Sequence, residues 1–177
     1  MKNFPIEYKG KTYWISRAVA VVGYVFCLDN GKLLILANKR GKGTPNYQGY
    51  WNCPCGYVDF DETTAEACCR EIAEETNLKV HPESLELYGI QDDPKEDPNQ
   101  NITFRYFTFS SHLYKGQTIY AKGEEPDEVE DVAWIPVEEL DDYKFAFDQD
   151  KTIKKILYYR LYDYISSELK EKLQKDV

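Results

Sequence analysis

The chain has 177 residues, 42% hydrophobic and 30% charged, which is typical of one globular domain with its own core. The net charge of −9 argues against binding to nucleic-acid backbones, which depends on Lys and Arg, and no apolar run approaches the length of a membrane span or a signal-peptide core. We therefore expect a single domain over residues 1–177, located in the cytoplasm, with a small-molecule substrate and no nucleic-acid or membrane partner.

The first half of the chain predicts strands. Residues 8–14 alternate around a glycine and predict a small hairpin. The Val-rich run 18–28 predicts a buried strand, and residues 32–37 predict the strand that returns after a turn. Arg40 follows in a basic segment, where it is suited to bind a phosphate, although a plain basic turn explains it equally well.

A helix is predicted after Thr63, which serves as N-cap with Glu66 three residues later, and it ends before Asn77. Glu71, Glu74 and Glu75 share one face of this helix because residues three and four apart are neighbours on its surface. Like charges at this spacing weaken a helix.

A divalent cation such as Mg²⁺, or Mn²⁺ as the alternative, accounts for these crowded carboxylates, since both ions prefer oxygen ligands. An ordinary solvated acidic helix is the competing interpretation of the glutamates taken alone. Arg70 stands within reach of Glu66 and Glu74 at i,i+4 spacing, and we expect it to orient the glutamates.

The longer pattern resembles the signature of the Nudix hydrolase family. Matching residue types stand at that motif's spacings at Gly56, Glu62, Arg70, Glu71, Ile72, Glu74, Glu75 and Leu78. Asn77 replaces the family's last glycine but tolerates the same left-handed backbone. The preceding stretch, residues 51–56, resembles the entry to the motif, with Cys55 in place of its first glycine.

This resemblance implies an α/β (α+β) fold in which a mixed β-sheet is sandwiched between helices. It also implies a metal-dependent hydrolase of phosphoanhydride bonds. By the same resemblance, Glu71, Glu74, Glu75 and the backbone of Gly56 would hold the metal, and Glu71, Glu74 and Arg70 would form the catalytic set. The substrate would be a nucleotide.

The general base is either Glu71 or a glutamate of the acidic segment 122–131, since the base varies within the family. The candidates in that segment are Glu124, Glu125 and Glu128. We also expect Glu125 and Glu128, together with Arg40, to contact substrate.

The remaining chain predicts strands at 85–90 and 102–113, with a loop over 91–101. Residues 132–140 resemble the family's strand that precedes a short helix, and Pro136 suits the entry to that helix. One long amphipathic helix is predicted at the C-terminus because apolar residues recur every four positions. Its stripe suits either core packing or a homodimer interface and consists of Ile153, Leu157, Leu161, Ile165, Leu169 and Leu173.

Other functions remain open at this stage. Residues 145–148 and the Asp-Pro loop look similar to Nudix members that act on ADP-ribose or related dinucleotides, although Gln149 replaces an expected His. Nucleoside triphosphates, then diadenosine polyphosphates, are the alternative substrates, and a non-catalytic nucleotide sensor is the alternative class. A zinc site at Cys53, Cys55, Cys68 and Cys69 is disfavoured by their spacing.

Overall fold

The structure is a computed structural model that describes residues 2–96, 99–114, 116–121 and 127–176. Its centre is a seven-stranded mixed sheet with the order β5-β4-β3-β8-β7, in which β6 also pairs with β3 and β9 with β4. Only β3 and β8 pair in parallel among the described strands. The strands are β3 (Val19–Asp29), β4 (Lys32–Arg40), β5 (Trp51–Asn52), β6 (Cys55–Tyr57), β7 (Glu86–Gln91), β8 (Ile102–Ser110) and β9 (Val129–Pro136).

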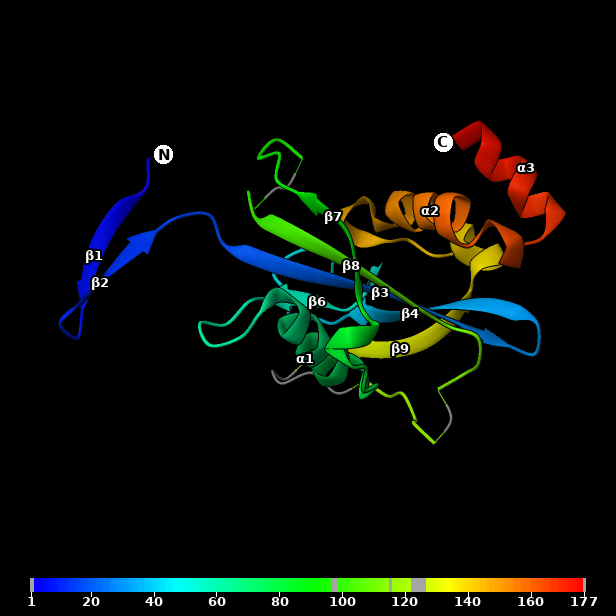
Figure 1. Cartoon of the computed structure of the whole chain (residues 1–177), viewed down its shortest axis with the longest axis horizontal. Coiled ribbons are helices and arrows are strands. Elements are labelled where there is room, and N and C mark those ends of the chain that lie inside the picture. Colours follow the sequence, from blue (N-terminus) through cyan, green and yellow to red (C-terminus); the bar gives the residue numbers. More distant parts are fainter. Residues whose placement is uncertain (1, 97–98, 115, 122–126, 177) are drawn as a thin grey trace.

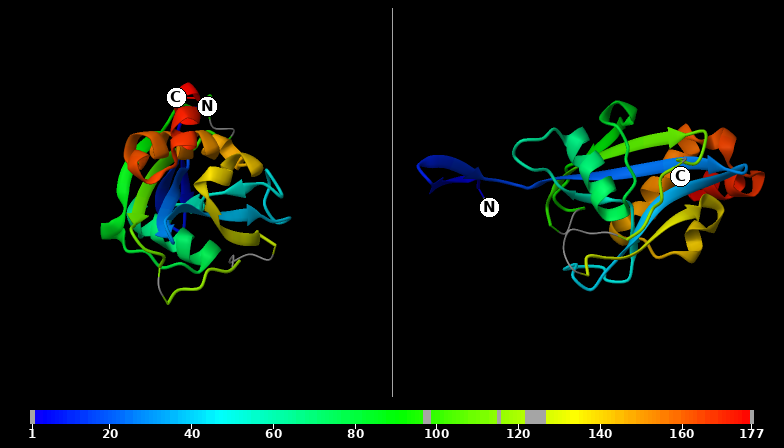
Figure 2. Two further views of the ribbon diagram at one scale, coloured as in Figure 1. Left: turned by 90° about the vertical axis from the view of Figure 1, so that its right-hand side faces the viewer. Right: turned by 90° about the horizontal axis from the view of Figure 1, so that it is seen from below.

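Helices cover both faces of this sheet (Figures 1 and 2). The central strand β3 separates two apolar clusters because its side chains alternate between the faces. Val21 and Val25 pack with Ile72 of α1 (Thr64–Thr76), whereas Tyr24 and Phe26 belong to the cluster that includes Ile153. The predicted fold, a mixed sheet between helices, is confirmed.

The prediction of a single C-terminal helix is wrong. The chain forms α2 (Gln149–Arg160), the short η4 (Tyr162–Tyr164) and α3 (Ser167–Asp176) instead. Ile165 is extended, with φ −108° and ψ 156°, and Ser166 Oγ accepts a hydrogen bond from the Leu169 amide at 3.2 Å, so Ser166 caps a new helix. All six residues of the predicted stripe are nevertheless buried, which makes the stripe part of the core.

Short 3₁₀ segments connect the larger elements: η1 (Pro82–Ser84), η2 (Val137–Asp142) and η3 (Ala146–Asp148). The predicted short helix after Pro136 is η2. The predicted N-terminal hairpin is β1 (Phe4–Tyr8) paired with β2 (Lys11–Ile15), and it projects from the body of the molecule (Figures 1 and 2). Strand β4 continues three residues beyond its predicted end and so carries Arg40 to the edge of the site.

Candidate active site

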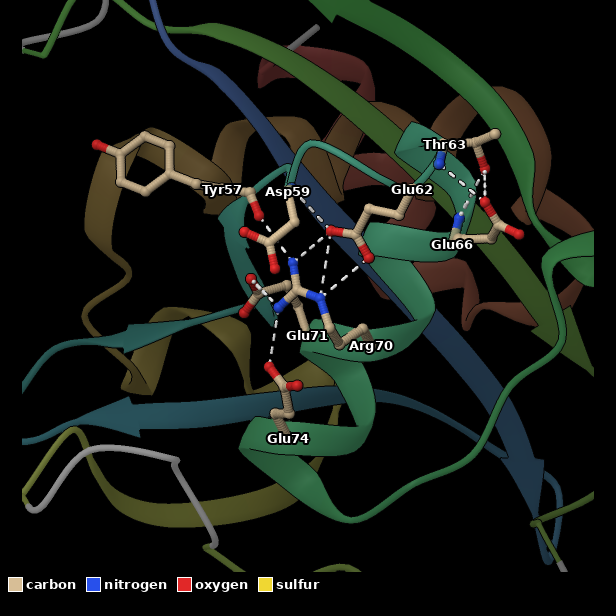
Figure 3. Close-up of polar contacts among 8 residues, drawn as sticks. All are labelled: Tyr57, Asp59, Glu62, Thr63, Glu66, Arg70, Glu71 and Glu74. Atoms are coloured by element: carbon tan, nitrogen blue, oxygen red, sulfur yellow. Dashed lines mark hydrogen bonds and ion pairs between the residues drawn. The ribbon is translucent and has the colours of Figure 1, made fainter. Parts of the chain in front are cut away.

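Helix α1 begins and ends as its sequence predicts. Thr63 and Glu66 form a reciprocal capping box, and Asn77 adopts the left-handed conformation at φ 62° with its amide bonded to the Ala73 carbonyl. Glu66 is therefore engaged with Thr63, and the expected pairing of Glu66 with Arg70 is not among the ion pairs of the described chain (Figure 3).

Arg70 is the centre of a carboxylate network (Figure 3). Its guanidinium donates to Glu62 Oε1 at 2.6 Å, to Glu71 Oε1 at 2.8 Å and to Glu74 Oε2 at 2.9 Å. A further bond of 2.8 Å to the Tyr57 carbonyl ties the network to β6. Arg70 thus fixes the orientation of two glutamates of the predicted catalytic set, as a positioning residue does.

The carboxylate of Glu71 packs closely against the backbone of Gly56. A Cβ atom at position 56 would come within 2.1 Å of Glu71 Oε1, so only glycine leaves room for this carboxylate. Burial raises the pKa of Glu71 to about 7, although the bonds from Arg70 partly oppose the shift.

Glu75 is the most deeply placed carboxylate, with 5% of its surface exposed. Its Oε2 accepts a hydrogen bond of 3.0 Å from the Cys55 amide, and burial together with the nearby Glu71 raises its pKa well above the ordinary value. An ionised carboxylate at this depth requires a compensating cation.

A cavity of about 380 Å³ opens beside these carboxylates and runs over the α2 face of the sheet. Its lining includes Gly56, Glu75, Arg40 and Glu128. Glu128 contributes to the raised pKa values of Glu71 and Glu75, so it belongs to the same acidic site. Glu124 and Glu125 lie outside the described residues.

Arg40 is positioned by its surroundings. Its Nε donates to the Asn46 carbonyl at 2.9 Å, and the guanidinium lies 5.2 Å from the ring centre of Phe147. Phe147 in turn contacts Tyr47 with ring centres 4.7 Å apart. The backbone is left-handed at Tyr47, Phe147 and Asp148, with φ between 54° and 56°. This conformation is costly for residues other than glycine and is concentrated at functional sites.

Several cavity residues were not predicted from the sequence. The aromatic pair Tyr47 and Phe147 is one example, because the two residues are 100 positions apart and only the fold brings them together. Arg105 is a second example. The alternation of side chains along β8 places Thr103 and Arg105 on one face of the sheet, so the sequence pattern could have indicated its position.

The four cysteines considered for zinc lie on two sides of the sheet. Cys53 is in the apolar cluster under α2 and Cys55 packs against it, whereas Cys68 and Cys69 belong to the cluster under α1. They serve as apolar filling. Among the described residues, no group of three His, Cys, Asp or Glu side chains is arranged to hold a metal ion as it stands. Arg70 donates hydrogen bonds to Glu71 Oε1 and Glu74 Oε2.

The sequence model of the NUDIX domain family matches residues 17–156 of this chain. The chain belongs to the Nudix hydrolase family. It is 31% identical over 141 residues to an ADP-ribose pyrophosphatase of Methanocaldococcus jannaschii, covering 80% of this chain and 73% of that protein. This Nudix chain is thus an enzyme of the hydrolase class.

Two solved structures share the Nudix fold with this chain. The NUDIX domain of Shewanella oneidensis NrtR, in complex with ADP-ribose, superposes with a TM-score of 0.67 at 20% identity, over 81% of this chain and 90% of that one. A bifunctional NMN adenylyltransferase/ADP-ribose pyrophosphatase of Francisella tularensis, with AMP and a manganese ion, gives 0.63 at 24% identity, over 85% and 42% of the two chains. No helix of the described residues is long and apolar enough to cross a membrane.

Proposed function

We propose that the chain is a divalent-metal-dependent hydrolase of the pyrophosphate bond in a nucleoside diphosphate linked to another group, with ADP-ribose as the best candidate. The observation that carries the proposal is the cluster of Glu71, Glu74 and Glu75 on α1, of which the buried Glu75 lines a cavity of about 380 Å³. The pyrophosphatase activity named for the M. jannaschii relative and the ADP-ribose in the NrtR domain support the choice of substrate.

The donor set fits a hard divalent cation. Glu71 and Glu75 are largely buried and have raised pKa values, and their negative charges exceed what Arg70 alone offsets. Glu71, Glu74, Glu75 and the carbonyl of Gly56 would hold Mg²⁺, or Mn²⁺ as in the F. tularensis neighbour. When bound, the metal would neutralise phosphate oxygens and acidify a water molecule.

The chain's own residues supply the remaining functions. Arg70 holds Glu71 and Glu74 in place, and Arg40 offers its remaining N–H groups to a phosphate at the cavity edge. Glu71, whose pKa lies near neutrality, is the proposed acceptor of the proton from the attacking water, with Glu128 as the loop alternative. We further propose that residues 1–177 act as one catalytic unit in the cytoplasm, in keeping with five unpaired cysteines.

A panel assay tests the proposal. The ratio kcat/KM is measured for ADP-ribose, NADH, diadenosine polyphosphates and common nucleoside triphosphates, with Mg²⁺ and then Mn²⁺. We expect ADP-ribose or a related dinucleotide to be the best substrate. A triphosphate preferred by about tenfold, or roughly 1.4 kcal/mol in transition-state binding, would overturn the substrate assignment. Tight nucleotide binding without any turnover would support a sensor instead.

A further inference from the structure

Two glutamates near the start of β9, Glu128 and Glu130, have different surroundings, although residues two apart on a regular strand share a face. Glu128 lines the cavity, and its negative charge contributes to the raised pKa values of Glu71 and Glu75. Glu130 is exposed, and its carboxylate accepts a hydrogen bond of 2.7 Å from Lys39 Nζ. The fold therefore places only one of these two carboxylates in the acidic site.

A register shift between β4 and β9 accompanies this difference. Lys39 pairs with Asp131 and Arg40 pairs with Val129, so Glu130 is an extra residue without a partner in register on β4. A β-bulge of this kind re-aims the side chains beside it, and bulges are frequent next to active sites. The side chains before and after the bulge are therefore released from the simple alternation of a strand.

The backbone at Glu128 is held by the turn that follows β4. The Gly41 amide donates to the Glu128 carbonyl at 2.7 Å, and the Gly43 amide donates to the Asp127 carbonyl at 2.9 Å. A Cβ atom at position 41 would meet the Asp127 carbonyl group, with its carbon only 2.7 Å away. Gly41 is not one of the glycines with a positive φ angle. This position therefore requires glycine for space, because any side chain would displace the carbonyl of Asp127.

Building on the proposed function, in which the glutamates of α1 hold a divalent cation, we propose that Gly41 is a positioning residue for Glu128. It holds the backbone of Glu128 so that this carboxylate adds its negative charge to the metal site. Glu128 and α1 are far apart in the sequence, so their relative placement depends on contacts between elements. Arg70 orients the carboxylates of α1, and Gly41 fixes the one that precedes β9.

Mn²⁺ binding tests this proposal without turnover. Electron paramagnetic resonance distinguishes free from bound Mn²⁺ and gives the dissociation constant for the unmodified chain, Gly41→Ala, Glu128→Gln and the double variant. Glu128→Gln removes one negative charge near the cation, so we expect the dissociation constant to rise roughly fivefold. Gly41→Ala should raise it by a similar factor. The double variant should lose no more than Glu128→Gln alone, because both substitutions act through the same carboxylate.

Three further variants serve as controls or as a substitute. Glu130→Gln removes the neighbouring carboxylate that bonds to Lys39, and Gly89→Ala adds a methyl group where a Cβ atom meets nothing within 4 Å. Both should leave the dissociation constant unchanged. Thr44→Val removes the hydroxyl that donates to the Gly41 carbonyl at 2.8 Å. It takes the place of Gly41→Ala if that variant does not fold, and its effect should likewise disappear in the presence of Glu128→Gln.

Three outcomes would overturn the proposal. They are an unchanged dissociation constant for Gly41→Ala, additive losses in the double variant, and equal losses from Glu128→Gln and Glu130→Gln. Absence of Mn²⁺ binding by the unmodified chain would overturn both this proposal and the proposed function. Mn²⁺ binding without turnover of any nucleotide would overturn the proposed function alone.

Discussion

At the scale of single residues, Glu75 is the carboxylate whose environment most requires a metal. It is 5% exposed, and its one hydrogen bond among those described comes from the Cys55 amide. Glu75→Gln should weaken Mg²⁺ binding and lower kcat by roughly 100-fold or more, as the loss of a key electrostatic group does. Folding should survive, because the substitution removes a buried charge.

Metal titration and steady-state kinetics measure these effects, with Glu138→Gln, at an exposed position of η2, as the matched control. An unchanged rate and metal dependence in the Glu75 variant would refute the assignment of Glu75 as a ligand.

Gly56 offers a second test at this scale. Gly56→Ala would place a methyl group within 2.1 Å of Glu71 Oε1, so the carboxylate must move. We expect a loss of turnover of roughly 100-fold, in line with the cost of displacing a group in an active site. Gly89→Ala is the control, since a Cβ there meets nothing within 4 Å. If Gly56→Ala and Gly89→Ala both retained the kcat/KM of the unmodified protein, the close approach of Gly56 to Glu71 would have no catalytic importance.

Much of the carboxylate site was predictable because it lies on one helix. The spacing of Glu71, Glu74 and Glu75 fixes their common face once α1 forms, and the capping residues fix where α1 begins. The capping box of Thr63 and Glu66 was predicted and is present, whereas the predicted pairing of Glu66 with Arg70 is not among the described ion pairs, because the two roles compete for the same side chain. The cavity was not predictable, because its lining residues such as Tyr47 and Phe147 are far apart in the chain.

At the scale of elements, the longer strands of the central sheet were predicted to within a few residues, whereas the short β5 and β6 and the break in the C-terminal helix were not. The apolar period continues through Ile165 even though the backbone there is extended, so periodicity alone did not reveal the break. Ser166 was the available signal, as a residue type that favours helix N-caps.

The capping role of Ser166 leads to a prediction about stability. Ser166→Ala removes the acceptor of the Leu169 amide and should lower the free energy of unfolding by about 1 kcal/mol. The ratio kcat/KM should be unchanged, because α3 does not line the cavity. Urea denaturation measures the change, and Ser167→Ala, one residue into the helix, is the control. Equal stability of the two variants would show that the cap contributes nothing.

At the scale of the whole molecule, the buried glutamates make stability depend on pH. The pKa of Glu71 is raised from 4.5 to about 7, and that of Glu75 is raised as well. Groups whose pKa is higher in the folded state contribute stability that is complete below the unfolded pKa and is lost as pH rises through the folded value. The pKa values of Glu62 and Asp141 are lowered from 4.5 and 3.8, so these groups contribute stability that is lost as pH falls. That loss occurs at pH values below the ordinary pKa of each group, outside the range in which Glu71 titrates.

We therefore expect Tm of the metal-free protein in EDTA to fall between about pH 5 and pH 8. Mg²⁺ should raise Tm more at the higher pH, because a ligand that binds only the folded state stabilises it and competes with protons for the carboxylates. Thermal unfolding at both pH values, with Glu71→Gln as the comparison, measures this. A Tm that does not fall, or a Glu71 variant with the same slope, would argue against titration of this site.

The products formed from ADP-ribose test the central claim most directly. The chain is incubated with ADP-ribose and Mg²⁺, or with EDTA as the blank, and the products are separated chromatographically. Hydrolysis of the pyrophosphate bond consumes one water and yields AMP and ribose 5-phosphate, and we predict both in equal amounts and only with metal. Release of ADP and free ribose, or no product with either Mg²⁺ or Mn²⁺, would contradict the account.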